Sequence, residues 1–216
     1  MSTFLRRITP LAGVALGVLI LVAFLLSGNS PSSSATGQHV IDWYTKHHDA
    51  QVATAFLLAY AGLLALIFGA SLRSYLRARS DSTAAIDVGF AGFVVFATGV
   101  AIFGGLGFAL TDHTSKYETA AAQALNILDD DLFVTILVGL AALLLASGFV
   151  IVVSGALPKW LGWVTLVIGV VVMTPIGFFG LLAFLAWSAV VGVWVFIREG
   201  KQPSGSATGS EQASAA

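Results

Sequence analysis

Long runs without a charged residue or a histidine dominate the chain and predict membrane-spanning helices. Four such runs cover residues 8–26, 52–72, 88–110 and 132–153, and each suits a hydrocarbon layer that a helix crosses in about 20 residues. A fifth run, residues 160–197, would form a helix of about 57 Å at 1.5 Å per residue, which is too long for one crossing. Pro175, Gly177 and Gly180 lie near its middle and favour a tight reversal.

The pattern therefore predicts an all-α membrane protein with six transmembrane helices in one bundle. Their expected bounds are about 8–26, 52–72, 88–110, 132–153, 161–176 and 180–197, so the transmembrane domain covers residues 8–197. The alternative is five crossings, in which the last helix is long, tilted and kinked at Pro175.

The distribution of Lys and Arg supports six crossings, because cytoplasmic loops carry an excess of basic residues. With the N-terminus inside, the cytoplasmic side holds eight of the ten basic residues: Arg6, Arg7, Arg73, Arg77, Arg79, Lys159, Arg198 and Lys201. Five crossings would move the last two outside. We therefore expect both termini in the cytoplasm, with residues 1–7 as a short N-terminal segment and the small, polar residues 198–216 as a disordered tail.

The first apolar run also raises the question of a signal peptide. A basic start, an apolar core and the small residues Ser33, Ser34 and Ala35 resemble a cleavable signal. The apolar core is longer than the roughly 7 to 15 residues of a removable signal, so we expect the first helix to be retained. Cleavage would leave five crossings with the same orientation.

The composition narrows the chemistry that the chain can perform. Of its 216 residues 57% are hydrophobic and 10% are charged, against roughly 25% charged in soluble domains. There is no cysteine, which excludes thiolate catalysis and cysteine-ligated metals. The predicted crossings contain no Asp, Glu, Lys, Arg or His, and Asp87 lies just before the third crossing. No nucleotide-binding or hydrolase motif is present. We expect no enzymatic activity, no cofactor and no nucleic-acid partner.

The two external loops carry all four histidines and most of the carboxylates. Val40, Trp43, Tyr44 and His47 recur at helical spacing and predict a short amphipathic helix on the outer surface. Residues 117–128 show a similar pattern and predict a second one. Asp129, Asp130 and Asp131 come directly before the fourth crossing, where carboxylates would stabilise the start of a helix.

The same loops offer weak candidates for a metal site: His47, His48, Asp112 and His113, with the run Asp129, Asp130 and Asp131 as further ligands. Imidazole and carboxylate ligands suit zinc or a similar ion. However, the candidates are adjacent pairs, and neighbouring residues on a helix point about 100° apart. Helix capping and interfacial packing explain these residues more simply.

Several residues are expected at the membrane interface, where basic side chains meet headgroups and tryptophan marks the boundary. They are Arg73, Arg77, Lys159, Trp160, Trp163, Trp194 and Arg198. Asp87 lies near the start of the third crossing, where we expect it to favour the helix N-terminus or to pair with Arg73 or Arg77.

Small residues recur four positions apart in most of the crossings, for example Gly13 with Gly17 and Ser188 with Gly192. Such faces let helix backbones approach closely. We expect them to pack within the bundle, and the alternative is a homodimer face.

Two blocks carry a resemblance to a known family. They are residues 40–77 and residues 156–170, of which the second includes Leu157, Pro158, Lys159, Trp160, Leu161, Gly162 and Trp163. The chain resembles a bacterial family of multi-pass membrane proteins of unknown function in which a turn of this kind opens a C-terminal helical hairpin. The resemblance implies the architecture and residence in the cytoplasmic (inner) membrane, and it carries no catalytic residue.

Function is therefore predicted from the absence of site chemistry. We expect a structural, accessory or interaction component of the membrane, with the lipid bilayer, other membrane proteins or a second copy as partners. One alternative is a small carrier or channel for an uncharged or amphiphilic solute, with a path lined by Thr98, Thr135 and Thr165. The other is an external metal or ligand sensor that uses the loops bearing His and Asp.

Overall fold

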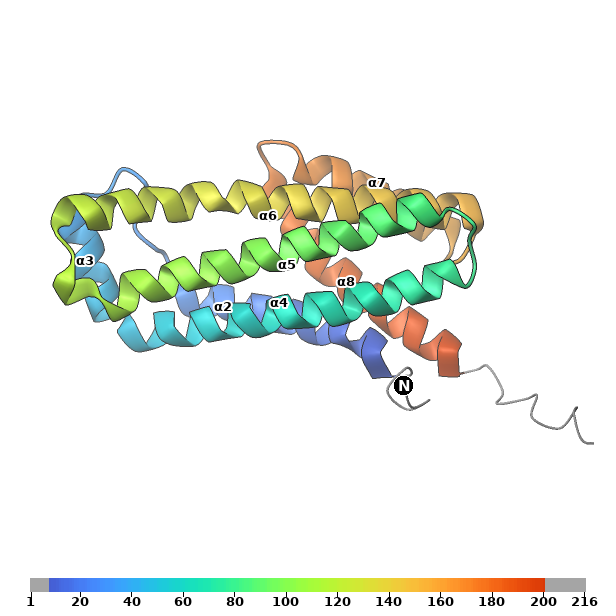
Figure 1. Ribbon diagram of the computed structural model, residues 1–216, viewed down its shortest axis with the longest axis horizontal. Helices are drawn as coiled ribbons and strands as arrows, with labels where there is room; N and C mark the ends of the chain where they lie inside the picture. The colour runs from blue at the N-terminus through green and yellow to red at the C-terminus, as the bar shows by residue number, and fades with distance from the viewer. Residues whose placement is uncertain (1–7, 201–216) are drawn as a thin grey trace, which may run out of the picture.

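A computed structural model describes residues 8–200, and the regular secondary structure of this part of the chain consists of helices (Figure 1). The elements are η1 (Thr9–Leu11), α2 (Ala12–Ser27), α3 (Gly37–Lys46), α4 (His48–Arg77), α5 (Thr83–Asp112), η2 (Thr114–Lys116), α6 (Thr119–Ser154), α7 (Lys159–Val172) and α8 (Gly177–Gly200). The expectations for residues 1–7 and for the tail beyond Gly200 lie outside the described residues.

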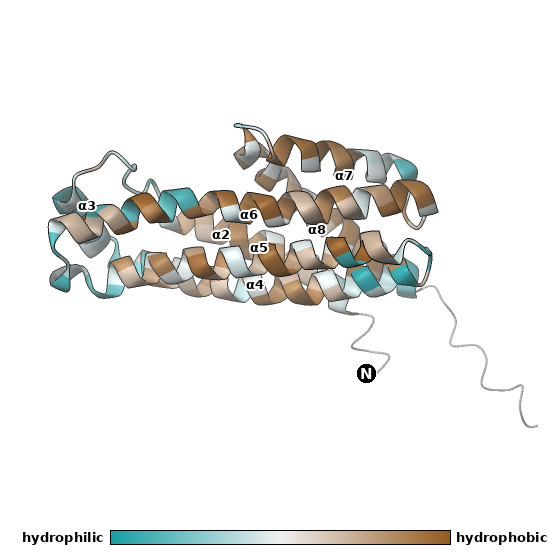
Figure 2. Cartoon of the chain, turned by 45° about the horizontal axis from the view of Figure 1, so that its top comes forward, coloured by the Kyte–Doolittle hydropathy of each residue, from teal (hydrophilic) through white to brown (hydrophobic). Residues whose placement is uncertain are grey.

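Five helical segments are long and apolar enough to cross a membrane, as expected of a membrane-embedded protein. They are Thr9–Ser27, His48–Arg77, Thr83–Asp112, Thr119–Ser154 and Gly177–Glu199. Helix α7 has 14 residues and is about 21 Å long, which is shorter than the hydrocarbon layer. Apolar residues fill the middle of the bundle and polar residues gather at its two ends (Figure 2).

Helices α7 and α8 form a hairpin, so the chain reverses where the sequence predicts it. Gly162 and Gly169 of α7 face Ile151 and Leu145 of α6, so α7 runs antiparallel to α6. Helix α8 then returns along α2, with Gly192 against Pro10. The alternative of one long helix kinked at Pro175 is wrong. The tip of the hairpin reaches the level of Leu137 on α6, which touches Gly177.

We name the two ends of the bundle by their residues. The α3 end carries α3, and the arginine end carries Arg73, Arg77 and the connection from α4 to α5. The start of α2 and the end of α8 both lie toward the arginine end (Figure 1). The tip of the hairpin stops short of the α3 end, where α4, α5 and α6 continue beyond it (Figure 1).

Helix α3 confirms the first predicted surface helix. It begins after Thr36, whose hydroxyl accepts a hydrogen bond from the backbone N–H of His39 at 3.4 Å. Val40 and Tyr44 are buried on its inner face, where they pack with Leu110 and Ala122. Gly37 lies against the backbone of Thr119, so α3 closely approaches the start of α6.

The second predicted surface helix does not exist as a separate element. Helix α6 begins at Thr119 and runs without a break to Ser154, which joins residues 117–128 to the fourth crossing. Asp129, Asp130 and Asp131 therefore lie inside a continuous helix and do not stabilise its start. The expectation is wrong because three successive carboxylates do not end a helix, and one turn of α6 accommodates them.

The small-residue faces are used within the bundle. A methyl group added to Gly13 would lie 2.6 Å from the Ser188 carbonyl oxygen, and the Ser188 hydroxyl donates to the Gly13 carbonyl at 3.0 Å. A methyl group on Gly92 would lie 2.9 Å from the Gly139 carbonyl oxygen. These approaches bring α2 against α8 and α5 against α6 by direct backbone contact, which is the principal packing mode available in lipid.

Candidate functional site

A cavity of about 420 Å³ lies between α2, α4, α5, α6 and α8. It is on the α3 side of the hairpin tip. Its lining spans residues 20–27 of α2, 51–58 of α4 and 129–136 of α6. Each range covers seven helical steps, or about 10 Å along the bundle. The volume falls in the range of about 300–1,000 Å³ that is typical of small-molecule sites.

Aromatic and aliphatic side chains form most of the cavity wall. Five phenylalanines contribute from four helices: Phe24, Phe96, Phe103, Phe133 and Phe178. The Phe178 ring at the hairpin tip lies 5.9 Å from the Phe24 ring and 6.4 Å from the Phe133 ring, measured between centroids. The end of the cavity nearest the hairpin is therefore apolar and bounded by the start of α8.

Polar side chains gather at the other end of the cavity, toward α3. They include Tyr44, Gln51, Thr54 and Asp129, and Ser27 and Ser30 also line the cavity. The Gln51 amide donates to the Ser27 carbonyl at 2.9 Å and so ties α4 to the end of α2. Among residues 8–200, the Thr54 hydroxyl and one carboxyl oxygen of Asp129 are buried and find no hydrogen-bond partner. Buried polar groups are nearly always paired, so these two atoms mark a site that the protein alone does not complete.

Asp129 is the most unusual of these residues. Its side chain comes from the interior of α6, it is 9% exposed, and no ion pair among the described residues includes it. No Lys, Arg or His from the described residues lines the cavity. Burial, together with the neighbouring Asp129 and Asp130, raises the pKa of Tyr44, so its phenol stays protonated and neutral.

One side of the cavity reaches the surface of the bundle. Leu21, Phe178 and Leu182 line it and are also exposed, with exposed fractions of 48%, 45% and 37%. Gly28 and Ser30 of the segment after α2 also line the cavity and are exposed, whereas these three residues belong to α2 and to the start of α8, where the cavity borders the lateral surface of the bundle. This surface is apolar, and in a membrane it would face lipid.

The residues predicted to bind a metal are placed in separate pairs. The Nδ1 atom of His48 lies 3.0 Å from Oδ1 of Asp49, and the Nδ1 atom of His113 lies 3.0 Å from Oδ2 of Asp112. The His47 ring stacks on Trp43, and its Nδ1 lies 2.8 Å from the Trp43 carbonyl oxygen. Within residues 8–200 the structure has no group of three or more such ligands that could hold a metal ion.

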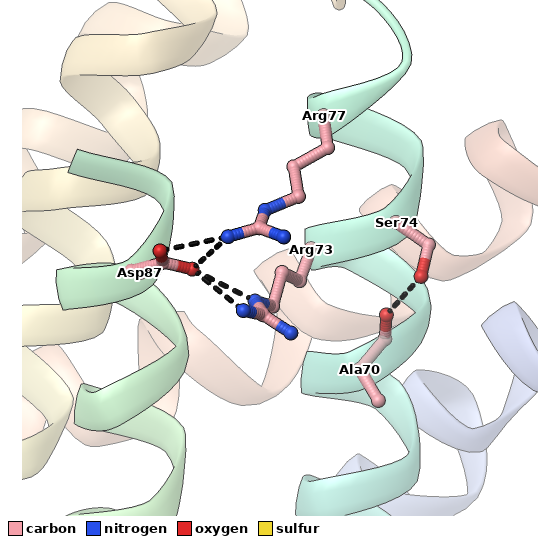
Figure 3. Close-up of polar contacts among 5 residues, drawn as sticks. All are labelled: Ala70, Arg73, Ser74, Arg77 and Asp87. Atoms are coloured by element: carbon pink, nitrogen blue, oxygen red, sulfur yellow. Dashed lines mark hydrogen bonds and ion pairs between the residues drawn. The ribbon is translucent and has the colours of Figure 1, made fainter. Parts of the chain in front are cut away.

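The predicted pairing of Asp87 with arginine occurs at the arginine end (Figure 3). Arg73 Nε donates to Asp87 at 2.9 Å, and Arg77 donates to both oxygens of Asp87 at 2.7 and 2.8 Å. Asp87 thus links α5 to α4. It lies beyond the first turn of α5, so it does not stabilise the helix start.

The remaining interface candidates divide into two groups. Trp160 and Trp163 are more than half exposed at the start of α7, just after Pro158, and Lys159 is the first residue of that helix. Trp194 is half-buried, and the Arg198 guanidinium lies 5.7 Å from its ring centroid. Trp194 therefore packs partly into the bundle, and Arg198 belongs to α8, which continues to Gly200.

The hydroxyl-lined path considered from the sequence is not assembled. Thr98 and Thr135 are exposed on the outside of α5 and α6. Thr165 is buried, donates to the Leu161 carbonyl and accepts from the Trp187 indole, both at 2.7 Å. The cavity uses different residues, above all Asp129 and Thr54.

The sequence places Asp129 at a helix start or among the external metal candidates, and it does not predict that the side chain is buried within α6. The signal was present: Ala122, Asn126, Asp129, Phe133 and Ile136 follow helical spacing and form one buried face of α6. Continuing the apolar pattern of residues 117–128 across the three carboxylates would have placed Asp129 inside.

Comparison of the chain with protein-family models, curated proteins and solved structures finds no match.

Proposed function

We propose that the protein is an integral membrane protein that binds one amphiphilic molecule in the cavity above the hairpin. The observation that carries this proposal is the cavity itself, with its apolar lower part and its polar end near α3. An amphiphile matches this division, because its apolar body fits among the phenylalanines while its head meets Thr54 and Asp129. The lateral surface at α2 and the start of α8 gives access from the lipid.

The proposal is for binding and not for catalysis. Within the described residues no hydrogen bond joins the Thr54 hydroxyl to a base, and the Gln51 amide is already used in the fold. Activation of a hydroxyl nucleophile requires a base within hydrogen-bond reach. We therefore propose that the polar groups of the cavity recognise a bound molecule.

We place the protein in the cytoplasmic membrane with six crossings and with the arginine end inside. The distribution of Lys and Arg supports this orientation. It puts the cavity in the outer leaflet. The absence of native cysteine makes the test direct, because Ser204→Cys and Ser30→Cys are single-cysteine variants. An impermeant thiol reagent on intact cells should label the second and spare the first, and the opposite pattern would refute the orientation.

The interaction function expected from the sequence has less support. The small-residue faces that would hold a partner are covered by neighbouring helices, as at Gly13 and Gly92. By contrast, the packing of the helices against one another does not require a cavity with buried polar groups, so the cavity supports a binding function.

A cavity-filling substitution tests the proposal. Ala55→Trp would fill the cavity, because Ala55 is buried in its wall on α4. Ala59→Trp is the matched control, one turn along α4 and exposed. The probe is dodecanol with a photoreactive diazirine on its chain, added to protein in phosphatidylcholine nanodiscs. We expect labelled peptides from α2, α4 and α8 in the native protein and in the control, and strong loss of labelling in Ala55→Trp.

Equal labelling of the two tryptophan variants would refute binding in this cavity. So would labelling of the native protein only at exposed positions such as Val94 or Val138, because these face lipid on the far sides of α5 and α6.

A further inference from the structure

We infer that the cavity selects an amphiphile whose head is an amine, held as an ammonium by the buried carboxyl of Asp129. The inference rests on the proposed function and adds the chemical class of the ligand. The head group would donate to Asp129 while the chain lies among the aromatic rings.

The first argument is the missing partner of Asp129. The side chain is nine-tenths buried, lines the cavity and has one oxygen without a hydrogen bond. In the part of the chain that the structure describes, no basic residue lines the same cavity to balance it. A buried carboxyl is normally paired with a cation or with several donors. A ligand ammonium supplies both a positive charge and three N–H donors.

The second argument is the set of neighbours. Phe133 follows Asp129 by four residues, so both lie on the same face of α6. Aromatic faces attract organic cations, and a carboxyl beside aromatic rings is a suitable environment for an alkylammonium head. Thr54 adds a hydroxyl that can accept a further N–H. Tyr44 stays neutral and does not compete for the cation.

The third argument is the charge around the cavity. The elements at the α3 end carry Asp42, Asp49, Asp112, Glu118, Asp130 and Asp131, against Lys46 and Lys116. Such a field raises the local concentration of cations and lowers that of anions. An anionic amphiphile, such as a fatty acid, would meet both this field and Asp129, so the structure disfavours it.

Three probes with the same chain and different heads test the inference: dodecylamine, dodecanol and dodecanoate. Binding is measured by native mass spectrometry from phosphatidylcholine nanodiscs, with empty nanodiscs correcting for partition into the lipid. We expect dodecylamine to bind about tenfold more tightly than dodecanol, because hydrogen bonds to charged groups are the stronger ones. Dodecanoate should bind most weakly.

The variant Asp129→Asn keeps the shape of the side chain and removes its charge. We expect it to bind dodecylamine and dodecanol within about threefold of each other. Asp131→Asn is the control, because Asp131 is two residues away and exposed. It should keep the full preference for the amine, which separates Asp129 from the general acidity of the α3 end.

The outcomes separate this inference from the proposed function. If none of the probes binds the native protein, the proposed function fails. If the native protein binds the amine and the alcohol equally, binding stands and the inference is overturned without any variant. If Asp129→Asn folds and keeps the preference for the amine, or if Asp131→Asn loses it, Asp129 is not the group that selects the head.

Discussion

The two halves of the bundle are built from the same kinds of residue and pack differently. Toward the arginine end, α7 and α8 fill the space beside α2 and α6, and glycines bring helix backbones into contact. Toward the α3 end the hairpin is absent, and a cavity with unpartnered polar atoms takes its place. In lipid no hydrophobic force closes a gap between helices, so a missing helix leaves room for a ligand.

The largest expected effect breaks the tightly packed half. Gly92→Leu would drive a side chain into the backbone of α6, because even a methyl group there lies 2.9 Å from the Gly139 carbonyl oxygen. We expect a loss of about 3 kcal/mol in the free energy of unfolding, measured in mixed micelles. Gly105→Leu is the control on the same helix, because no atom lies within 4 Å of an added methyl group. Equal losses would contradict the close contact between α5 and α6.

A second prediction compares one substitution in the two halves and expects opposite signs. Thr165→Val removes the acceptor of the buried Trp187 indole and should cost about 2 kcal/mol. Thr54→Val removes a buried hydroxyl that has no partner and should gain about 1 kcal/mol when no amphiphile is added. Thr165→Ser retains the acceptor and should lose less than the valine variant. A loss at Thr54 would show that its hydroxyl has a partner.

The smallest effect appears only at high pH. The pKa of Tyr44 is raised, chiefly by burial, above its ordinary value of about 10. The unfolded chain releases this proton at a lower pH than the folded chain does, so the stability due to Tyr44 is complete below pH about 10 and falls above it. Between about pH 8 and about pH 11 the native protein should lose about 1 kcal/mol more than Tyr44→Phe. An unchanged difference would mean that Tyr44 is accessible to solvent.

The sequence predicted where most helices lie, because a run without charge is the direct requirement of an apolar layer. It predicted the reversal near Pro175 and the surface helix at α3 for equally local reasons. Four helices, α4, α5, α6 and α8, are longer than the predicted crossings. Helix α4, for example, extends from His48 to Arg77, whereas the run covers residues 52–72. Helical backbone continues past the lipid boundary, and a charge count does not detect this continuation.

The candidate site was largely beyond prediction from the sequence. Helical spacing places Asp129 on the buried face of α6, but the cavity beside it depends on α3, on the end of α2 and on the place where the hairpin stops. None of these follows from periodicity in a single helix. Conversely, the histidines are metal-ligand candidates by residue type, whereas the structure pairs His48 and His113 with their neighbours in the sequence.

Hydrogen bonds from α4 and α6 hold the end of α2 and the segment between α2 and α3. Asn126 of α6 donates to the Pro31 and Ser32 carbonyls at 3.3 and 3.1 Å, and Gln51 of α4 holds the Ser27 carbonyl. Gly28 and Ser30 of this segment line the cavity, so the segment forms a fixed roof over it. We therefore expect the residence time of an occupant to depend on the thickness and fluidity of the surrounding bilayer, since departure into the lipid does not require the roof to open.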